Sequence, residues 1–290
     1  MTGTSSDPTS NRSDSSLAFT RPSTARMYNY YLGGKSWFDV DRAAAEAVLR
    51  SAPDAGAVAR ENFLFAGRAA AWAAKTHGIG QVLDIGAGIL SGVPLPSVED
   101  HVHQACPGAV VVGCDNDPVV LAHARGLRTG YKRVLEGDVR DLGTIFGNPD
   151  LKKALNIADP MVVVLAAVLH FVPDDQVNGV VDNLRRRLAP GSVLVMSHAT
   201  SSATDQRRVS GMEQAYDDAT SRIHFRTEEE ITGLLVEWDV VDPPALCDVA
   251  RWGLPTPHHG QPGRDVRVVG MAAVLPDHWQ GQVRAPGGVR

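Results

Sequence analysis

Cysteine is scarce in this chain and does not occur in the patterns that build disulfide or metal sites. Cys106, Cys114 and Cys247 are the three cysteines among 290 residues, and none belongs to a C-x-x-C pair. Three cysteines are too few for the framework of a disulfide-stabilised protein, and unpaired thiols are typical of a reducing compartment. We therefore expect a cytoplasmic protein.

Long apolar runs and an excess of basic residues are also missing. No run approaches the roughly 18 uncharged apolar residues of a membrane span, and the N-terminal residues MTGTSSDPTSNRSDSS lack the basic and apolar regions of a signal peptide. The 28 lysines and arginines are outnumbered by 33 aspartates and glutamates, which gives a net charge of −5. Because sequence-independent nucleic-acid binding depends on positive surface, we expect neither a membrane nor a nucleic acid as partner.

The composition is that of a folded protein, with 43% hydrophobic and 21% charged residues. Residues 1–20 are rich in Ser and Thr and hold almost no apolar side chains, so they are expected to form a disordered tail. Residues 278–290 are expected to form a second, flexible tail. The folded part then comprises residues 21–78 and 79–277, which differ in pattern.

Residues 21–78 show helical spacing of apolar residues throughout. A short helix is predicted to end at Gly33, a second to begin with Asp39 or Asp41 as N-cap, and a third, rich in Ala, to end at Gly78. We interpret this segment as an N-terminal helical cap on the rest of the chain.

From residue 79 onward, short β-branched runs alternate with amphipathic helical segments. Continuous apolar strands separated by roughly 20–30 residues predict a parallel sheet that helices cover on both faces. The five predicted strands are QVLDIG (81–86), VVVGCD (110–115), RVLEGD (133–138), MVVVLAAV (161–168) and SVLVMSHA (192–199).

The last third of the chain departs from this alternation. Residues 201–226 form a polar helical insertion, and Thr227 with Glu230 is typical of a capping box that opens another helix. The runs EWDVVDP (237–243) and RVVGMAAVL (267–275) follow with no helix between them, which predicts an antiparallel hairpin. The fold class is therefore α/β, with a mostly parallel Rossmann-like sheet and an antiparallel last strand.

A glycine turn follows the first strand directly. Gly86 and Gly88 allow backbone N–H groups to approach a ligand at the strand edge where open α/β sheets bind their ligands. Ser91 stands where a dinucleotide site has its third glycine, and no GK[ST] follows as in a phosphate-binding loop. The pattern therefore argues against a nicotinamide or nucleoside triphosphate site.

Carboxylates lie at the ends of three successive strands: Asp84, Asp115 and Asp138. A carboxylate at the end of the second strand suits the two hydroxyls of a ribose, and one at the next strand suits the exocyclic amine of an adenine. Three acids would repel a pyrophosphate but tolerate a cationic ligand without phosphate. S-adenosylmethionine has these properties, because it joins an adenosine to a sulfonium and an amino acid.

In these motifs the sequence resembles the class I S-adenosylmethionine-dependent methyltransferases, and most closely the actinobacterial S-adenosyl methyltransferase family long catalogued as a domain of unknown function. The N-terminal segments ARMYNYYLGGKSWFDVDR and ARENFLFAGRA share the likeness, which covers about residues 22–250. The motifs that carry it in the sheet region are LDIGAG, VVVGCDNDPVVLAHAR, EGDVRD, VVVLAAVLHFVPDD and LAPGSVLVMSHAT.

The resemblance implies a seven-stranded sheet with a reversed last strand, S-adenosyl-L-methionine as cofactor and S-adenosyl-L-homocysteine as product. It implies cofactor contacts from the strand ends and, because the family's N-terminal helices fold over the cofactor, from the cap. These contacts are Asp84, Gly86, Gly88, Asp115, Asn116, Asp138, Val139 and Ala167 in the sheet domain, and Tyr31, Gly33 and Arg60 in the cap.

Two histidines are candidates for the transfer step. His170 follows the fourth strand, which in this fold faces the transferred methyl group, and His198 closes the fifth strand at the same edge. A neutral imidazole there acts as a base or orients the acceptor, because its ordinary pKa of about 6.5 lies near neutral pH. We expect a small-molecule acceptor, held between the helices before residue 78 and the insertion at 201–226.

A metal site is not expected. His101 and His103 are two residues apart on a predicted helix and do not share a face, and His258 and His259 lie in a Pro/Gly-rich loop without acidic neighbours.

Alternatives to a methyltransferase are a non-catalytic S-adenosylmethionine-binding module, an NAD(P)-dependent oxidoreductase, and another reaction at the sulfonium. A homodimer is compatible with the sequence.

Overall fold

The computed structural model describes residues 20–126, 133–241, 245–254, 260 and 263–277. The predicted tails, apart from residue 20, lie outside this part of the chain, and so do His258 and His259. Within it, no helix is both long enough and apolar enough to cross a membrane.

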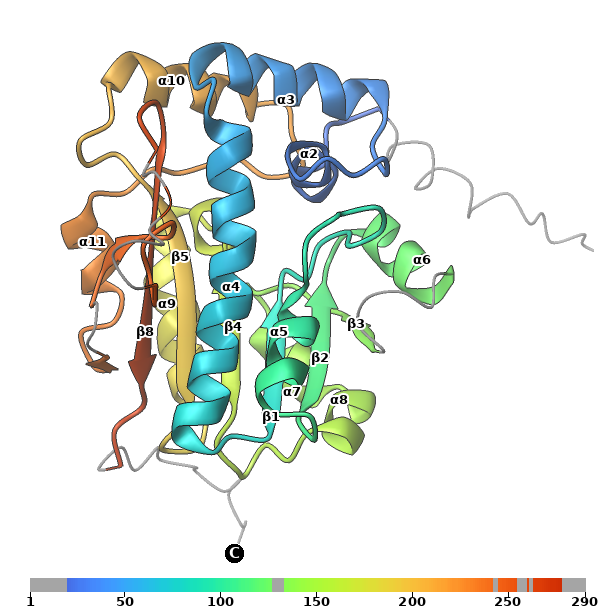
Figure 1. Ribbon diagram of the computed structural model, residues 1–290, viewed down its shortest axis with the longest axis vertical. Coiled ribbons are helices and arrows are strands. Elements are labelled where there is room, and N and C mark those ends of the chain that lie inside the picture. Colours follow the sequence, from blue (N-terminus) through green and yellow to red (C-terminus); the bar gives the residue numbers. More distant parts are fainter. Residues whose placement is uncertain (1–19, 127–132, 242–244, 255–259, 261–262, 278–290) are drawn as a thin grey trace, which may run out of the picture.

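An eight-stranded sheet forms the centre of the molecule, in the order β3-β2-β1-β4-β5-β8-β6, with β7 also paired to β8 (Figure 1). Strands β1 to β5 are parallel, and β8 runs antiparallel to β5. The strands are β1 (Gln81–Ile85), β2 (Val110–Asp115), β3 (Val134–Glu136), β4 (Val162–Ala166), β5 (Val193–Thr200), β6 (Asp239–Val240), β7 (Cys247–Asp248) and β8 (Arg267–Val274).

The predicted parallel sheet and antiparallel end are confirmed, with one difference in strand number. β6 pairs with β8 as the predicted hairpin does. The two-residue β7 pairs with β8 as well, at Val269 and Gly270. β7 was not predicted, because a strand of two residues shows no periodic pattern of apolar side chains.

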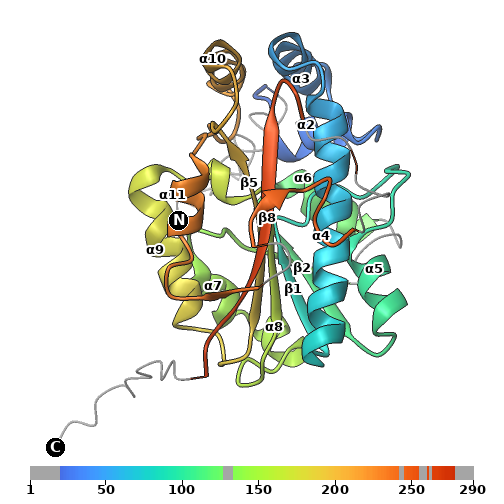
Figure 2. The same cartoon turned by 60° about the vertical axis from the view of Figure 1, so that its left-hand side comes forward.

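Helices cover both faces of the sheet, as Figure 2 shows edge-on. One face packs on α4 (Ala55–His77) and α5 (Val98–Ala105), and the other on α7 (Leu142–Gly147), α8 (Pro149–Ala154), α9 (Asp174–Arg185) and α11 (Glu228–Gly233). The strands supply both cores because successive side chains point to opposite faces: Val162 and Val164 join one core, and Val163 and Leu165 the other. α6 (Pro118–Gly126) follows β2, and a short 3-10 helix spans Leu169–Phe171.

The cap consists of α2 (Thr24–Tyr31) and α3 (Asp39–Ser51), joined by α10 (Gln206–Ala215) from the insertion, above the carboxyl ends of the strands (Figure 1). Gly33, with φ of 83°, follows the end of α2, and Gly78 ends α4 in the left-handed conformation. The predicted N-cap of α3 was wrong: Phe38 holds that position, and Asp41 reaches back to accept its N–H at 2.8 Å. Within 201–226, α10 is helical and the rest consists of turns, bends and residues without regular secondary structure, with one isolated bridge at Arg226.

A buried ion pair ties the two cap helices together. Arg26 Nε lies 2.7 Å from Asp41 Oδ2, with side chains 2% and 0% exposed. Asp41 Oδ1 accepts the N–H of Ser23, whose hydroxyl in turn donates to Asp117 at the start of α6. The cap is therefore joined by hydrogen bonds to the loop that follows β2.

A second polar connection joins α4 to the ends of β4 and β5. The Ser197 hydroxyl donates to Asn62 Oδ1 at 2.5 Å and accepts the N–H of Ala167 at 2.9 Å. Asn62 also donates to the Tyr28 hydroxyl at 2.8 Å. Ala167 has φ of 57°, a conformation that costs energy for a residue with a side chain. The hydrogen bond to Ser197 helps to hold it there.

We expect Asp41→Asn to lower the free energy of unfolding by about 3–5 kcal/mol, because it leaves the Arg26 guanidinium buried without a counter-charge. Urea denaturation followed by circular dichroism measures the loss. Asp39→Asn is the matched control: Asp39 lies two residues away, its side chain is 92% exposed, and its pairing with Arg42 is a surface contact. Its loss should stay within about 1 kcal/mol. Equal losses would contradict the role of the buried pair.

Ser197→Ala should lower the free energy of unfolding by about 1–3 kcal/mol, since it leaves the Asn62 carbonyl and the Ala167 N–H without their buried partner. The same denaturation experiment measures it. Ser210→Ala serves as control because Ser210 is exposed on α10, and we expect a change within about 0.5 kcal/mol. A Ser197 variant as stable as this control would rule out the connection.

Candidate functional site

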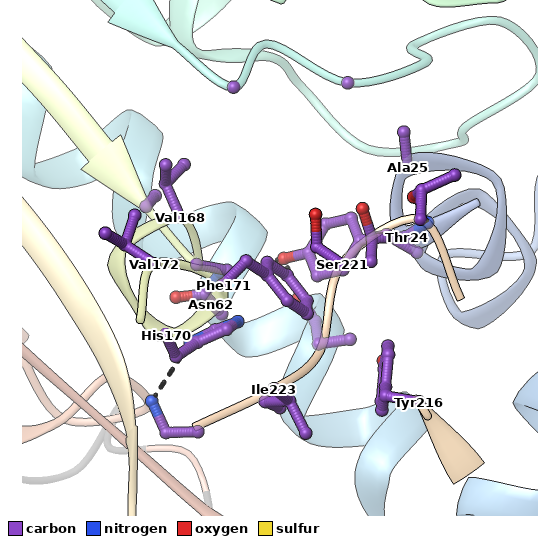
Figure 3. Close-up of a pocket in the computed structure, with 18 of the residues that line it drawn as sticks. Thr24, Ala25, Asn62, Val168, His170, Phe171, Val172, Tyr216, Ser221 and Ile223 are labelled. Carbon is purple, nitrogen blue, oxygen red and sulfur yellow. Dashed lines mark hydrogen bonds between the residues drawn. The ribbon is translucent and has the colours of Figure 1, made fainter. Parts of the chain in front are cut away.

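A cavity of about 350 Å³ lies between the cap and the carboxyl ends of the parallel strands. The loops after β1, β2, β3 and β4 form one side, and α2, α3, α4 and residues 212–225 form the other (Figure 3). The sequence-predicted residues that line it are Tyr31, Gly86, Gly88, Asp115, Asn116, Asp138, Val139, Ala167 and His170. Gly33, Arg60, Asp84 and His198 were also predicted for the site and are not among its lining residues.

The glycine turn after β1 forms the floor of the cavity. Gly86 has φ of 85°, and a Cβ there would overlap the side chain of Val168, so only glycine fits. Gly88 has φ of 65°, and a Cβ at this position would meet no protein atom within 4 Å. The turn therefore leaves open space above Gly88, where a ligand can approach the backbone.

Asp115 lies beside this turn at the end of β2. Its carboxylate accepts the N–H of Gly88 and the N–H of Asp117, both at 2.9 Å and one on each oxygen. Burial raises the pKa of Asp115 to about 6, although the backbone hydrogen bonds oppose the shift. The carboxylate is thus fixed in orientation, and each oxygen keeps a further lone pair for a ligand donor.

Asp138 lines the cavity one strand further along, but it already has protein partners. Arg140 donates to it from Nε at 2.9 Å and from Nη2 at 2.5 Å, and Asn116 donates at 2.9 Å. The hydrogen bonds from Arg140 are the main reason that the pKa of Asp138 falls to about 2. Arg140 neutralises this acid and itself lines the cavity, a pairing that the sequence analysis missed although the two residues lie in one motif, GDVRD.

Three of the predicted cofactor contacts, Asp84, Arg60 and Gly33, do not line the cavity. Asp84 is buried in β1, where its charge contributes to the raised pKa of the Tyr28 hydroxyl, for which burial is the larger cause. Arg60 is exposed and donates to the carbonyl of Tyr31 at 3.0 Å. Together with Gly33, it shapes the end of α2 and so supports the position of Tyr31.

His170 lies in the cavity wall with a defined tautomer. Its Nδ1 accepts the N–H of Ala199 at 3.2 Å (dashed in Figure 3), so the neutral ring carries its proton on Nε2. Burial lowers the pKa of His170 well below its ordinary value, and the nearby His198 and Arg226 add to the shift. At neutral pH this ring is an uncharged hydrogen-bond donor through Nε2.

His198 is completely buried on the other side of that wall. Its Nδ1 contacts the carbonyl of Ala199 at 2.7 Å, and its Nε2 lies 2.7 Å from Arg226 Nη1. Burial, assisted by the charge of Arg226, lowers the pKa of His198 to about 4. Both ring nitrogens have protein partners, so this histidine positions Arg226 and the strand end and offers no free group to the cavity.

The sequence analysis missed much of the wall that faces the cap. Asn62, Phe171 and Tyr216 line the cavity and face into it in Figure 3. Asn62 directly follows Arg60 and Glu61 in α4, so nothing in its local sequence marks it as a site residue. Phe171 ends a three-residue 3-10 helix and Tyr216 follows the last residue of α10, and no periodic pattern marks either position. Within the described residues, no three of His, Cys, Asp and Glu gather as metal ligands.

Comparison with known proteins assigns a family to this site. The family model for S-adenosyl methyltransferases matches residues 10–275. The structure is similar to a DUF574 family protein of Streptomyces avermitilis, with a TM-score of 0.81 and 29% identity over 90% of this chain and 100% of the other. It is also similar to a protein of Thermobifida fusca described as a candidate methyltransferase, with a TM-score of 0.80 and 28% identity over 92% of this chain and 100% of the other.

A shorter similarity links the chain to a curated enzyme. It is 29% identical over 122 residues to a carboxy-S-adenosyl-L-methionine synthase of an Enterobacter species, which covers 40% of this chain and 43% of the synthase. The match thus spans less than half of either protein. From the family model and the two solved structures, the chain belongs to the S-adenosyl methyltransferase family.

Proposed function

We propose that this protein binds S-adenosylmethionine in the cavity beneath the cap and transfers its methyl group to a small-molecule acceptor. The observation that carries the proposal is the Asp115 carboxylate, buried at the end of β2 and aligned by two backbone N–H groups beside an open glycine turn. Its two remaining lone pairs suit the vicinal hydroxyls of a ribose. Membership of the family supports the same reading.

Different residues around the turn would contact different parts of the cofactor. Asp115 would accept the ribose hydroxyls, the backbone at Gly86 and Gly88 would lie against the amino acid arm, and Asp138 with Val139 would border the adenine. When bound, the cofactor supplies a methyl group activated by the sulfonium. The protein's own part is then to align the acceptor with that group and to exclude water.

His170 contributes to alignment rather than to proton removal. Its Nδ1 lone pair is occupied by the Ala199 N–H, and its Nε2 carries the proton, so the ring donates a hydrogen bond into the cavity and has no lone pair free for a base. We propose that Nε2–H orients an oxygen or nitrogen acceptor atom of the substrate. His198 is not proposed to act on substrate, because its ring nitrogens are both engaged in the wall.

The size of the cavity favours a small acceptor. About 350 Å³ lies at the lower end of the range of roughly 300–1,000 Å³ typical of small-molecule sites. The cap covers the strand ends with helices from three parts of the sequence, α2, α3 and α10. A large or extended acceptor would have to displace them.

Calorimetry with S-adenosylhomocysteine tests the proposal directly. We expect binding to the full-length protein, and a loss of about 2–4 kcal/mol in Asp115→Ala, which corresponds to roughly 30- to 1,000-fold in affinity, because the ribose loses its charged acceptor. Asp150→Ala is the control, since Asp150 is an exposed residue of α8 paired with Lys153 at the surface. The proposal fails if the protein binds neither S-adenosylhomocysteine nor S-adenosylmethionine.

Two further measurements separate the alternatives. Binding of NADH with no binding of S-adenosylhomocysteine would indicate an oxidoreductase. Binding of S-adenosylmethionine without its consumption across a broad panel of acceptors would indicate a non-catalytic module.

The affinity for S-adenosylhomocysteine should fall as pH is lowered. The folded-state pKa of Asp115, about 6, lies above its ordinary value of 3.8, so protonation stabilises the unliganded protein, and this contribution is lost as pH rises through 6. Binding needs the ionised carboxylate, so the affinity for S-adenosylhomocysteine increases as pH rises through 6. We expect about a tenfold loss between pH 7.5 and 5.

Asp115→Asn provides the matched control for this pH dependence. It has no ionisable group at this position, so its weaker affinity should stay nearly constant between pH 7.5 and 5. A wild-type affinity that is constant over the same range would refute the assignment to Asp115.

A further inference from the structure

The two ends of the cavity differ in charge. Of the described residues that line it, the charged ones are Asp115, Asp117, Asp138 and Arg140. All four come from the end of β2 and the loops after β2 and β3, where the adenosyl part of the cofactor is proposed to bind. The described lining of the other end, beneath α3 and α10, carries no charged side chain.

Apolar groups dominate this second end, which we call the acceptor end. Phe171 and Tyr216 form its aromatic wall, with ring centroids 5.6 Å apart and planes tilted by 50° (Figure 3). Around them lie Val48, Val58, Met212, Ile223, Phe225 and Val268.

The polar groups of the acceptor end are neutral at physiological pH. Burial raises the pKa of Tyr216 to about 12, and it raises the pKa of Tyr31 well above its ordinary value. His170 is uncharged and presents its Nε2–H, as described above. The Tyr31 hydroxyl is buried near Tyr216, and the interaction between the two side chains contributes to the raised pKa of Tyr31. Hydrogen-bonding groups are therefore available here, but counter-charges are not.

We infer that the acceptor is an uncharged aromatic molecule, seated against Phe171 and Tyr216 and holding an oxygen or nitrogen atom toward His170. The inference rests on the proposed function, because it assigns the acceptor end as the second half of a methyltransferase site. An aromatic ring gains both apolar burial and ring contacts against such a wall. A carboxylate or ammonium would lose its hydration without gaining a partner.

The test uses three naphthalene probes of one ring size and different charge: neutral 2-naphthol, anionic 2-naphthoate and cationic 2-naphthylmethylammonium. Each is titrated at pH 7 into the full-length protein saturated with S-adenosylhomocysteine. We expect 2-naphthol to bind at least tenfold more tightly than either charged probe. Equal or tighter binding of a charged probe, or binding of none of the three, overturns the inference.

A charge placed in the wall should change this preference in a predictable direction. Ile223 lines the acceptor end and is half-buried (Figure 3), so the ammonium of Ile223→Lys can reach the cavity. The variant should bind 2-naphthoate at least tenfold more tightly than the wild type does, with no gain for the cationic probe. Val236→Lys, at a position 82% exposed and away from the cavity, is the control and should leave all three affinities unchanged. No gain for 2-naphthoate in a folded Ile223→Lys variant counts against the inference.

The inference and the proposed function fail on different measurements. If the wild type binds neither S-adenosylhomocysteine nor S-adenosylmethionine, the proposed function fails, and the three probes are then compared on the protein alone. Normal S-adenosylhomocysteine binding with preference for a charged probe removes the acceptor class and leaves the cofactor assignment intact. Retained S-adenosylhomocysteine binding in Ile223→Lys shows that this variant is folded, so its probe affinities can be interpreted.

Discussion

The reversal of strand order at β1 creates the space on which the rest of the site depends. β1 pairs with β2 on one side and with β4 on the other. The chain moves outward from β1 to β3 and then crosses back to begin β4, so the loops after β1 and β4 leave the sheet in different directions. A crevice opens between such loops at the carboxyl ends of the strands. Gly86 and Val168 lie in contact across its base, which sets how closely the two loops approach.

The cap turns this open crevice into a cavity, and polar contacts determine where the cap sits. α4 has a central role because one continuous helix packs on the sheet and also extends beside α2 and α3 (Figure 1). Asn62 on α4 reaches the ends of β4 and β5 through Ser197, and Ser23 before α2 reaches the loop after β2 through Asp117. Apolar packing alone would allow the cap to slide, whereas buried hydrogen bonds are satisfied in one position. These hydrogen bonds therefore fix the position of the cap relative to the loops that line the cavity.

Much of the fold could be predicted from local sequence patterns, because strands, helices and glycine turns each leave a characteristic spacing of residue types in the chain. The parallel strands, the ends of α2 and α4, and the turn at Gly86 belong to this class. The N-cap of α3 does not, since Asp41 is recruited to the buried guanidinium of Arg26 as well as to its own helix.

The different roles of the two histidines at the site could not be predicted from local sequence either. His170 follows β4 and His198 lies near the carboxyl end of the adjacent β5, and nothing in their local sequence separates their roles. Arg226, distant in sequence from both, contacts the Nε2 of His198 and leaves His170 facing the cavity. Asp84 and Asp115 differ in a similar way, because the glycine turn brings the Gly88 N–H to one carboxylate and not to the other. Such distinctions arise from contacts between distant segments, which a sequence pattern does not contain.

The distribution of charge along the cavity favours a different ligand at each end. Three acids and one arginine at the β2 and β3 loops give that end an excess of negative charge, which favours a cationic ligand. The acceptor end offers ring faces, aliphatic groups and neutral donors, so a charged group placed there would be desolvated without compensation. Each of the two proposed ligands would therefore be penalised in the other's position: a cationic cofactor at the apolar end, and an uncharged acceptor among the acids. Specificity is a difference between binding free energies. The contrast between the acidic and the apolar end would therefore orient both ligands, even without a hydrogen bond that only one of them can make.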